Sequence, residues 1–331
     1  MALEQDAKQV FSNFKLEPVR HTANFGHLFA DYVELWSCLR NGDVVSKADL
    51  VNRFRDYDVS VPYLSGAVAG PPTQQERKDL TSAEVDDKYD DWATQVFSII
   101  ETRLDVVRDA YPFELEKKCV RIIGSPSSRQ QLYLILLMCS NLHYFRGFTD
   151  LLTSDFEQVA LEALKNFLPD FAIVRQLGKK SDYPGNAQQK IKALAGDLNV
   201  AVNEHELEKV EGNQERGLDV VGWIPFSDRF ANLLCILGQC ACGQDWNAKL
   251  SETRRFEYSY FFFKKLNPIH AMFIPRGLYH NKDFFESGEI SGSLIFDRCR
   301  ILHLINDDAL LMKLNSHIVV KAYIDSMEAV A

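Results

Sequence analysis

The sequence lacks any long uninterrupted apolar segment. Its longest apolar run, Leu132–Cys139, falls far short of the roughly 20 residues that a membrane-spanning helix needs. The N-terminus also has no apolar core of the kind found in secretory signal peptides. We therefore expect a soluble, cytoplasmic protein with no membrane partner.

Cysteine and histidine groupings typical of metal sites are also absent. The seven cysteines are odd in number and several stand in apolar runs, which is typical of reduced, buried thiols in a cytosolic protein. Cys240 and Cys242 do not have the spacing of a zinc knuckle, and no second Cys or His pair lies nearby. The eight histidines are scattered singly. Neither a zinc site nor a Ser/His/Asp triad is expected.

An overall excess of positive charge is missing as well. The formal net charge of −9 argues against a protein that coats nucleic acid by charge alone. Basic residues outnumber acidic ones locally, between Lys249 and Lys282, where only Glu252 and Glu257 are acidic. Such a cluster can bind phosphate groups, or it can form an ordinary solvated surface.

The sequence does contain enough apolar residues for substantial cores, since 46% of its 331 residues are hydrophobic. This length suffices for about two domains. Helical periodicity dominates the first half, with capping-box patterns at Thr81–Glu84 and Ser128–Gln131. Helices are expected at Phe25–Leu39, Ser46–Phe54, Leu132–Leu142 and Thr153–Phe167, with a loop at Gly66–Pro72. A further helix follows the Thr81–Glu84 capping box, has an apolar face from Trp92 to Val107 and ends at Tyr111-Pro112. We predict an all-α domain over residues 1–178 that has a regulatory role, docks a partner protein or dimerises.

The polar, turn-rich segment Gly178–Gly185 marks the expected domain boundary. Beyond it, helices and strands alternate. We expect helices at Ala187–Leu198 and Trp246–Phe263, strands at Leu218–Trp223, Asn232–Cys242, His270–Arg276 and Leu294–Phe296, and helices from Arg298 onward. The order α-β-β-α-β predicts a mixed α/β fold, a sheet flanked by helices, over residues 179–331.

Polar side chains stand at the ends of two neighbouring apolar strands. Asp219 opens the first strand, Gln239 closes the second, and Lys249 follows further along the chain. Because neighbouring strands can bring their ends together, these three residues can share a metal-sized site. Each residue also has a structural alternative. Asp219 can cap a turn, Gln239 can hydrogen-bond a backbone group at a sheet edge, and Lys249 can be an ordinary exposed lysine.

These motifs resemble the PD-(D/E)XK nuclease superfamily, and within it the Mrr-like restriction endonuclease branch. The resemblance covers about Tyr183 to Ile305. Gly217-Leu218-Asp219 matches the Asp strand of that branch, and Gly212 and Glu215 match the turn before it. Gln239-Cys240 matches the start of its Gln-x-Lys element. The resemblance implies a restriction-endonuclease-like core that hydrolyses DNA phosphodiester bonds.

The sequence departs from that pattern at three positions. Ala241 stands where the branch usually has Lys, Gln189 stands where a helical Glu is common, and the second acid is the amide Gln239. Because the superfamily allows the lysine to come from the following helix, Lys249 is the natural candidate for it.

The resemblance also implies a divalent cation, Mg²⁺ or Mn²⁺. Mg²⁺ prefers oxygen ligands and takes only one or two carboxylates from a protein. We expect Asp219 to supply the carboxylate, Gln239 its side-chain carbonyl and Cys240 its backbone carbonyl. Glu215 would add a second carboxylate if the chain turns back before Asp219; otherwise it is a solvated residue. Lys249 would orient the attacking water or stabilise charge in the transition state.

Two functions remain open at this point. The first is a metal-dependent DNA endonuclease, and because cutting both strands needs two active sites, a homo-oligomer is expected. Family-level analogy adds a role in restriction or in antiviral defence against phage. The second is a catalytically inactive nuclease-fold module that binds DNA or a partner protein through the basic cluster Lys249–Lys282.

Overall fold

The computed structural model describes most of the chain. The described residues are 2–12, 14–19, 25–39, 43–59, 82–178, 180–212, 217–226, 228, 233–263, 266–280, 283–284, 292–306 and 308–326. The predicted loop Gly66–Pro72 and Thr81, the first residue of a predicted capping box, lie outside them. Among the described helices, none combines the length and the apolar composition that crossing a bilayer requires.

Packing divides the chain into two compact units, each formed by segments that are distant in sequence. Unit 1 comprises Met1–Leu134, Gly277–Asp283 and His317–Ala331, and unit 2 comprises Ile135–Arg276 and Phe284–Ser316. This division differs from the predicted boundary at residues 178 and 179. The reason is that two elements before that boundary belong to unit 2: a strand of its main sheet, and a long helix that packs against that sheet.

Unit 1 is built mainly of helices but also contains a sheet. Its helical elements are α1 (Ala2–Phe11), α2 (Phe25–Leu39), α3 (Lys47–Asp56), α5 (Ser82–Val107), the 3-10 turn η1 (Arg108–Ala110), the first part of α6 (Ser128–Cys139) and most of α12 (Ser316–Ile324). The antiparallel sheet has the order β1-β3-β2 and contains β1 (Val45–Ser46), β2 (Phe113–Glu116) and β3 (Cys119–Ile122). In addition, β10 (Tyr279–His280) pairs with β11 (Asp283–Phe284). The prediction of an all-α domain over residues 1–178 is therefore wrong.

The hairpin β2–β3 has a weak sequence signal. Apolar and charged residues alternate over four positions in β2 and over only three in β3, with Phe113, Val120 and Ile122 buried. Lys117 and Lys118 form the turn, and their φ angles of 50° and 61° fit a type I′ turn. Because glycine, asparagine or aspartate usually marks such turns, two lysines give no turn signal.

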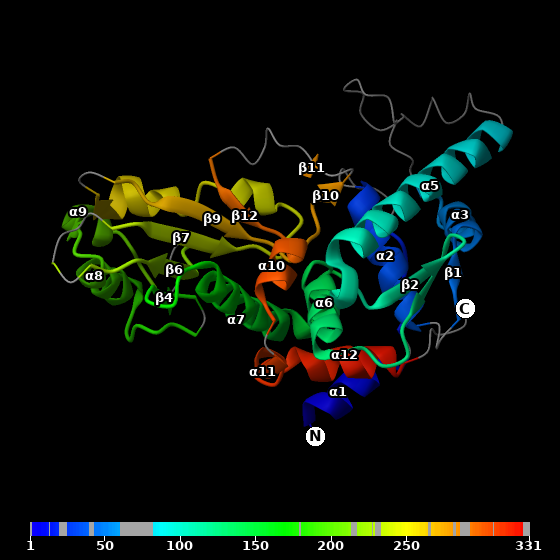
Figure 1. The fold of residues 1–331 in the computed structure, drawn as a ribbon, viewed down its shortest axis with the longest axis horizontal. Coiled ribbons are helices and arrows are strands. Elements are labelled where there is room, and N and C mark those ends of the chain that lie inside the picture. The colour runs from blue at the N-terminus through cyan, green and yellow to red at the C-terminus, as the bar shows by residue number, and fades with distance from the viewer. Residues whose placement is uncertain are drawn as a thin grey trace. The chain divides into compact units, whose positions relative to one another are not determined.

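Unit 2 contains a five-stranded mixed sheet with the order β12-β9-β7-β6-β4 (Figure 1). Its strands are β4 (Ile173–Gln176), β6 (Val220–Trp223), β7 (Cys235–Cys240), β9 (Ile269–Phe273) and β12 (Leu294–Phe296). β4, β6 and β7 pair antiparallel, whereas β7, β9 and β12 pair parallel. The prediction of a mixed α/β fold is confirmed at this level. The edge strand β4 was not predicted.

The helical elements of unit 2 lie before, between and after these strands. They are the second part of α6, the 3-10 turn η2 (Arg146–Phe148), α7 (Thr149–Phe167), α8 (Ala187–Asp197), α9 (Glu204–Leu207), the 3-10 helix η3 (Trp246–Lys249), the π-helical segment η4 (Phe256–Tyr260), α10 (Arg298–Leu304) and α11 (Asp308–Leu311). The predicted helix Trp246–Phe263 is therefore not continuous. Its aromatic end favours extended structure, and β8 (Phe261–Phe262) pairs antiparallel with β5 (Ala201–Val202).

Two helix starts differ in detail from the sequence analysis. At α8, the side chains of Asn186 and Gln189 each accept a hydrogen bond from the other residue's backbone N–H, so Gln189 caps the helix. At α6, the reciprocal pair is Ser127 and Gln130, one residue earlier than the predicted capping box.

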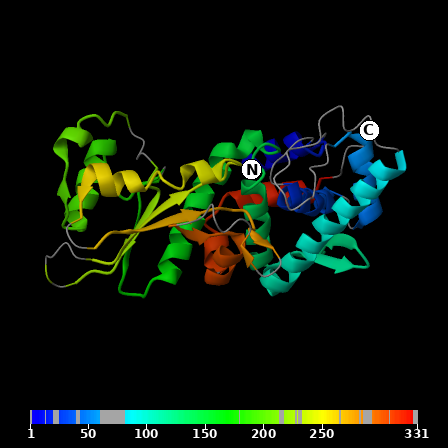
Figure 2. The ribbon, with the colours of Figure 1, turned by 90° about the horizontal axis from the view of Figure 1, so that it is seen from above.

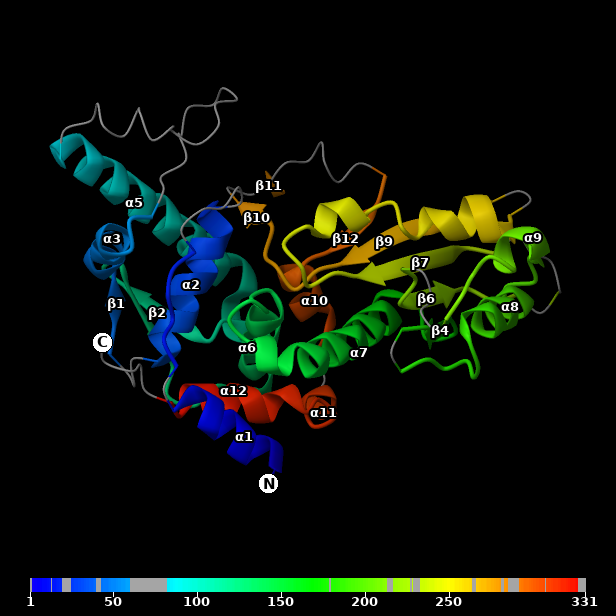
Figure 3. The same cartoon turned by 180° about the vertical axis from the view of Figure 1, so that it is seen from behind.

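The two faces of the unit 2 sheet are covered by different elements. On one face, Val221 and Leu237 belong to a buried apolar cluster that also contains Ile191 of α8. On the other face, Gly222 lies against α7. A Cβ at this glycine would lie 2.6 Å from Leu168 Cδ1 and 3.3 Å from Leu164 Cδ2. Figures 2 and 3 show α7 alongside the strands from two directions.

Candidate functional site

Unit 2 contains a cavity of about 780 Å³ at the end of β7. Its lining includes the three residues singled out by the sequence: Asp219, Gln239 and Lys249. Asp219 directly precedes β6, Gln239 is the second-last residue of β7, and Lys249 ends η3. The antiparallel pairing of Val220 with Gly238 brings the first two together. The three residues therefore line one cavity, and their use as a catalytic site stays a prediction.

Asp219 is held firmly between β4 and β7. Its side-chain Oδ2 accepts a 2.6 Å hydrogen bond from the backbone N–H of Cys240, and its own backbone N–H donates to the carbonyl of Gly238 at 3.0 Å. The Asp219 carbonyl accepts the N–H groups of Leu177 and Gly178 at 2.7 and 3.2 Å. Only 9% of the residue is exposed. A backbone N–H favours the ionised carboxylate, so this geometry places a negative charge at the edge of the cavity.

The two ends of the Gln239 side-chain amide have different surroundings. Its Nε2 donates to the Oε2 of Glu252, whereas its Oε1 is buried and has no hydrogen-bond partner among the described residues. The residue is 2% exposed. The plain structural alternative, in which Gln239 serves a backbone group at a sheet edge, is not what the side chain does here.

Gly217 explains why this turn needs glycine. Its φ of 91° lies in the left-handed region that side chains disfavour. A Cβ would overlap Glu252 Oε2, would lie 2.8 Å from Glu252 Cβ and would lie 3.2 Å from Gln239 Nε2. The glycine of the Gly-Leu-Asp motif therefore leaves room for the Glu252–Gln239 pair.

Lys249 and Cys240 complete the predicted set. Lys249 is exposed and lines the cavity. Burial raises the pKa of the Cys240 thiol well above its usual range, and Asp219 and Glu157 raise it further, while the Lys249 charge opposes them. A thiol with a raised pKa is a poor nucleophile at neutral pH, so any role of Cys240 would fall to its backbone carbonyl. Glu215, the fourth predicted ligand, lies outside the described residues.

Five charged residues that the sequence analysis did not assign to the site also line the cavity: Asp150, Glu157, Lys190, Glu252 and Arg255. Glu157 of α7 is 8% exposed, and its Oε2 accepts a 3.1 Å hydrogen bond from Gln176 Nε2. It belongs to a helix assigned to the other predicted domain, so no spacing rule could have connected it to Asp219.

The lining suits an oxygen-liganded cation. Within the described ranges, no group of three or more His, Cys, Asp and Glu side chains is arranged to hold a metal ion. A site formed by Asp219 and Gln239 would instead combine one carboxylate with one amide oxygen. Hard cations such as Mg²⁺ and Mn²⁺ accept carboxylate, carbonyl and water oxygens. The buried Oε1 of Gln239, which no donor among the described residues contacts, is an oxygen that could serve as such a ligand.

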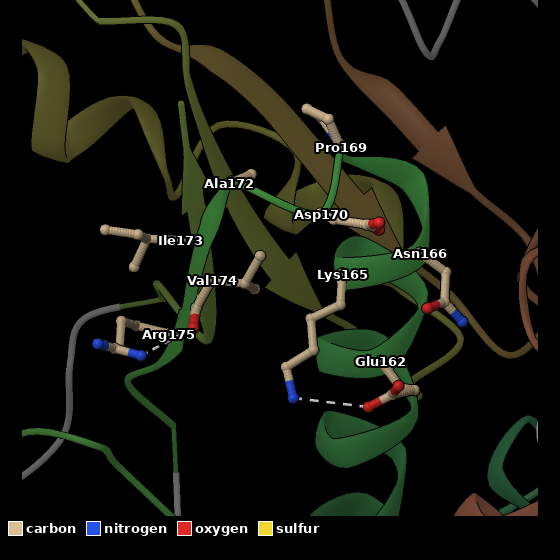
Figure 4. A pocket seen from close by; sticks show the side chains of 9 residues that line it. All are labelled: Glu162, Lys165, Asn166, Pro169, Asp170, Ala172, Ile173, Val174 and Arg175. Carbon is tan, nitrogen blue, oxygen red and sulfur yellow. Dashed lines mark hydrogen bonds and ion pairs between the residues drawn. The ribbon is translucent and has the colours of Figure 1, made fainter. Parts of the chain in front are cut away.

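A second cavity, of about 460 Å³, lies between the end of α7 and β4 (Figure 4). Lys165 on its wall pairs with Glu162 of the same helix at 3.5 Å. Arg175 donates weakly to the carbonyl of Val174 at 3.5 Å. None of the predicted site residues lines this cavity. The first cavity is therefore the candidate functional site.

Comparison with known proteins adds no relative. No protein-family model matches the chain, and no curated protein or solved structure matches it either.

Proposed function

We propose that unit 2 is a divalent-metal-dependent nuclease of the PD-(D/E)XK type that hydrolyses DNA phosphodiester bonds. The observation that carries this proposal is that Asp219, Gln239 and Lys249, drawn from two strands and the segment after them, line one cavity. The antiparallel pairing of β6 with β7 supports it, because it brings the Asp motif beside the Gln motif.

Each residue would have a distinct part in the reaction. Asp219 and the Oε1 of Gln239 would hold Mg²⁺ or Mn²⁺, with the Cys240 carbonyl as a further oxygen ligand. The bound cation would supply charge neutralisation and lower the pKa of a water molecule. The Lys249 ammonium would hydrogen-bond the scissile phosphate and stabilise the charge that develops on its oxygens.

The rim of the cavity offers further contacts for a phosphate backbone. Lys190 and Arg255 also line it, and cationic side chains position nucleic acids through their phosphates. We further propose that the protein cuts duplex DNA as a homo-oligomer, because two sites are needed for two strands. A role in restriction or antiviral defence, with unit 1 docking a partner protein, belongs to the same proposal.

The test is cleavage of supercoiled plasmid by the purified full chain with Mg²⁺ or Mn²⁺. The wild type should nick or linearise the plasmid, and Asp219→Ala and Lys249→Ala should each reduce the rate by about 10²- to 10³-fold, because each removes a charge needed at the reacting phosphate. Lys165→Ala, which removes an exposed lysine outside the cavity, is the matched control and should cut like the wild type. Equal rates for all four proteins would contradict the assignment.

The alternative, a nuclease-fold module without catalysis, is supported by Lys190 and Arg255 in the lining, since their side chains can contact phosphate whether or not hydrolysis follows. A gel-shift arm of the same experiment separates the two functions. Metal-independent DNA binding that is lost in Arg255→Glu, together with an intact plasmid, would favour the binding module.

A further inference from the structure

We propose that Glu252 is a positioning residue that fixes the side-chain amide of Gln239, so that the carbonyl oxygen of Gln239 is available as a ligand for a divalent cation. The inference rests on the proposed function, since it concerns the same cavity. Glu252 lies outside the sequence motifs and follows Gln239 by 13 residues.

The chemistry of the two side chains fixes the orientation. An ionised carboxylate can only accept hydrogen bonds, whereas an amide has an NH₂ end that donates and a carbonyl end that accepts. Because Nε2 of Gln239 donates to Oε2 of Glu252, the carbonyl end must point away from Glu252. Without this carboxylate, the amide could rotate and present its NH₂ group, which carries partial positive charge, to a cation.

The carbonyl end is left in an unfavourable state by the protein alone. Oε1 of Gln239 is buried without a hydrogen-bond partner among the described residues. A buried acceptor without a donor costs about 1–3 kcal/mol. A cation that accepts an oxygen ligand would remove this cost, which explains why an amide is held in this orientation.

Glu252 itself is confined from two sides. The backbone of Gly217 packs so closely against it that a Cβ there would overlap Oε2. The next residue, Thr253, forms a 2.9 Å hydrogen bond between its Oγ1 and Nδ1 of His270. The other ring nitrogen of His270, Nε2, lies 2.8 Å from Oε2 of Glu257. These bonds join the segment that carries Glu252 to β9. The carboxylate is therefore fixed by the sheet as well as by the glycine of the motif.

The test measures Mn²⁺ binding by the full chain, with free Mn²⁺ determined by electron paramagnetic resonance. Glu252→Gln should weaken Mn²⁺ binding by about 10- to 100-fold, the usual effect of losing a residue that orients a metal ligand. Asp245→Asn, an exposed residue on the same segment that does not line the cavity, removes the same charge and should bind Mn²⁺ like the wild type.

A swapped pair separates positioning from a loss of charge at position 252. In Gln239→Glu/Glu252→Gln, the new amide donates to the new carboxylate, and an anionic oxygen at position 239 again faces away from its partner. The Mn²⁺ affinity of this variant should be at least about one third of the wild-type affinity. Thermal unfolding of each variant verifies that it folds. A swapped variant as weak as Glu252→Gln would overturn the inference.

The Mn²⁺-binding experiment and the plasmid-cleavage experiment test the two proposals separately. Mn²⁺ binding that follows this pattern while the plasmid stays intact would leave Glu252 in its role and remove the proposed function. Plasmid cleavage with unchanged Mn²⁺ affinity in Glu252→Gln would do the reverse. A wild type that does not bind Mn²⁺ has no ligand to position, and this result would also overturn the inference.

Discussion

Several buried cysteine thiols should make the stability of this protein depend on pH in the alkaline range. Burial raises the pKa of Cys235 on β7 to about 12, from an ordinary value of 9.0. Burial also raises the pKa of Cys38 and of Cys139. These thiols stay protonated in the folded chain at pH values where an unfolded chain releases the proton.

We predict that Cys235 makes the free energy of unfolding fall as the pH rises. The folded-state pKa is raised, so the stabilisation is complete below pH 9.0 and is lost between pH 9.0 and about 12. In that window one thiol contributes a slope of about 1.4 kcal/mol per pH unit. The free energy of unfolding, measured with urea at each pH in this range, should fall less steeply with pH for Cys235→Ala than for the wild type.

The control for this prediction is Val221→Ala, which opens a similar space in the same buried cluster without removing a titratable group. It should be destabilised at all pH values and keep the wild-type slope. Parallel pH profiles for Cys235→Ala and the wild type would contradict the assignment.

At the scale of single residues, the sequence predicts polar groups at strand ends better than their partners. Asp219 and Gln239 could be brought together because they flank two consecutive strands. Glu252 could not, because its bond to Gln239 depends on how the chain turns between η3 and η4. Glu157 reaches the cavity from α7, and only the packing of that helix on the sheet places it there.

At the scale of elements, a buried charge network joins the helices of unit 1. Arg103 of α5 contacts Asp31 and Glu34 of α2, each at 2.8 Å. Glu34 also accepts hydrogen bonds from the hydroxyls of Tyr111 and Tyr133, both at 2.8 Å. Burial alone would lower the pKa of Arg103, but the two carboxylates raise it well above its usual range. The guanidinium is therefore charged and pairs with both acids.

We predict that Arg103→Met lowers the free energy of unfolding by about 3–5 kcal/mol, because it removes a buried guanidinium that pairs with two buried carboxylates. Urea unfolding followed by circular dichroism measures this loss. Arg121→Met, which removes an exposed pair with Glu114 on the β2–β3 hairpin, is the matched control and should have little effect, since solvent screens exposed pairs. Similar losses in the two variants would contradict a special role for the network.

Elements with a strong period or a cap were predicted well. The bounds of α2 and β12 agree with the sequence analysis, since one has a sustained apolar face and the other a short apolar run. The segment 246–263 was predicted wrongly because the helix was extended into aromatic residues that favour a strand when a partner strand is present. There the partner strand β5 decides the outcome, and the sequence of the segment does not contain that information.

At the scale of the whole molecule, the predicted boundary at residues 178 and 179 separates the sheet of unit 2 from two of its own parts. α7 and β4 both precede that boundary, and both belong to unit 2. The change in composition near Gly178 is real, but it marks the polar turn after β4. A turn inside a unit and a linker between units have the same composition, so sequence alone does not distinguish them.

We predict that a fragment of residues 179–331 does not fold, whereas a fragment of residues 135–316 does. In the shorter fragment, Gly222 loses the apolar cover of Leu164, and β6 loses its antiparallel partner β4. The carbonyl of Asp219 loses the N–H groups of Leu177 and Gly178, and a buried backbone group without a partner is unfavourable.

Near-ultraviolet circular dichroism and thermal unfolding of the two fragments measure this difference. The fragment 135–316 should show an ordered aromatic signal and a cooperative transition, because it keeps α7, β4 and the apolar cluster around Val221 together. The fragment 179–331 should show neither. A cooperative transition in the shorter fragment would mean that the sheet can close without β4 and α7, and the original boundary would then be the correct one.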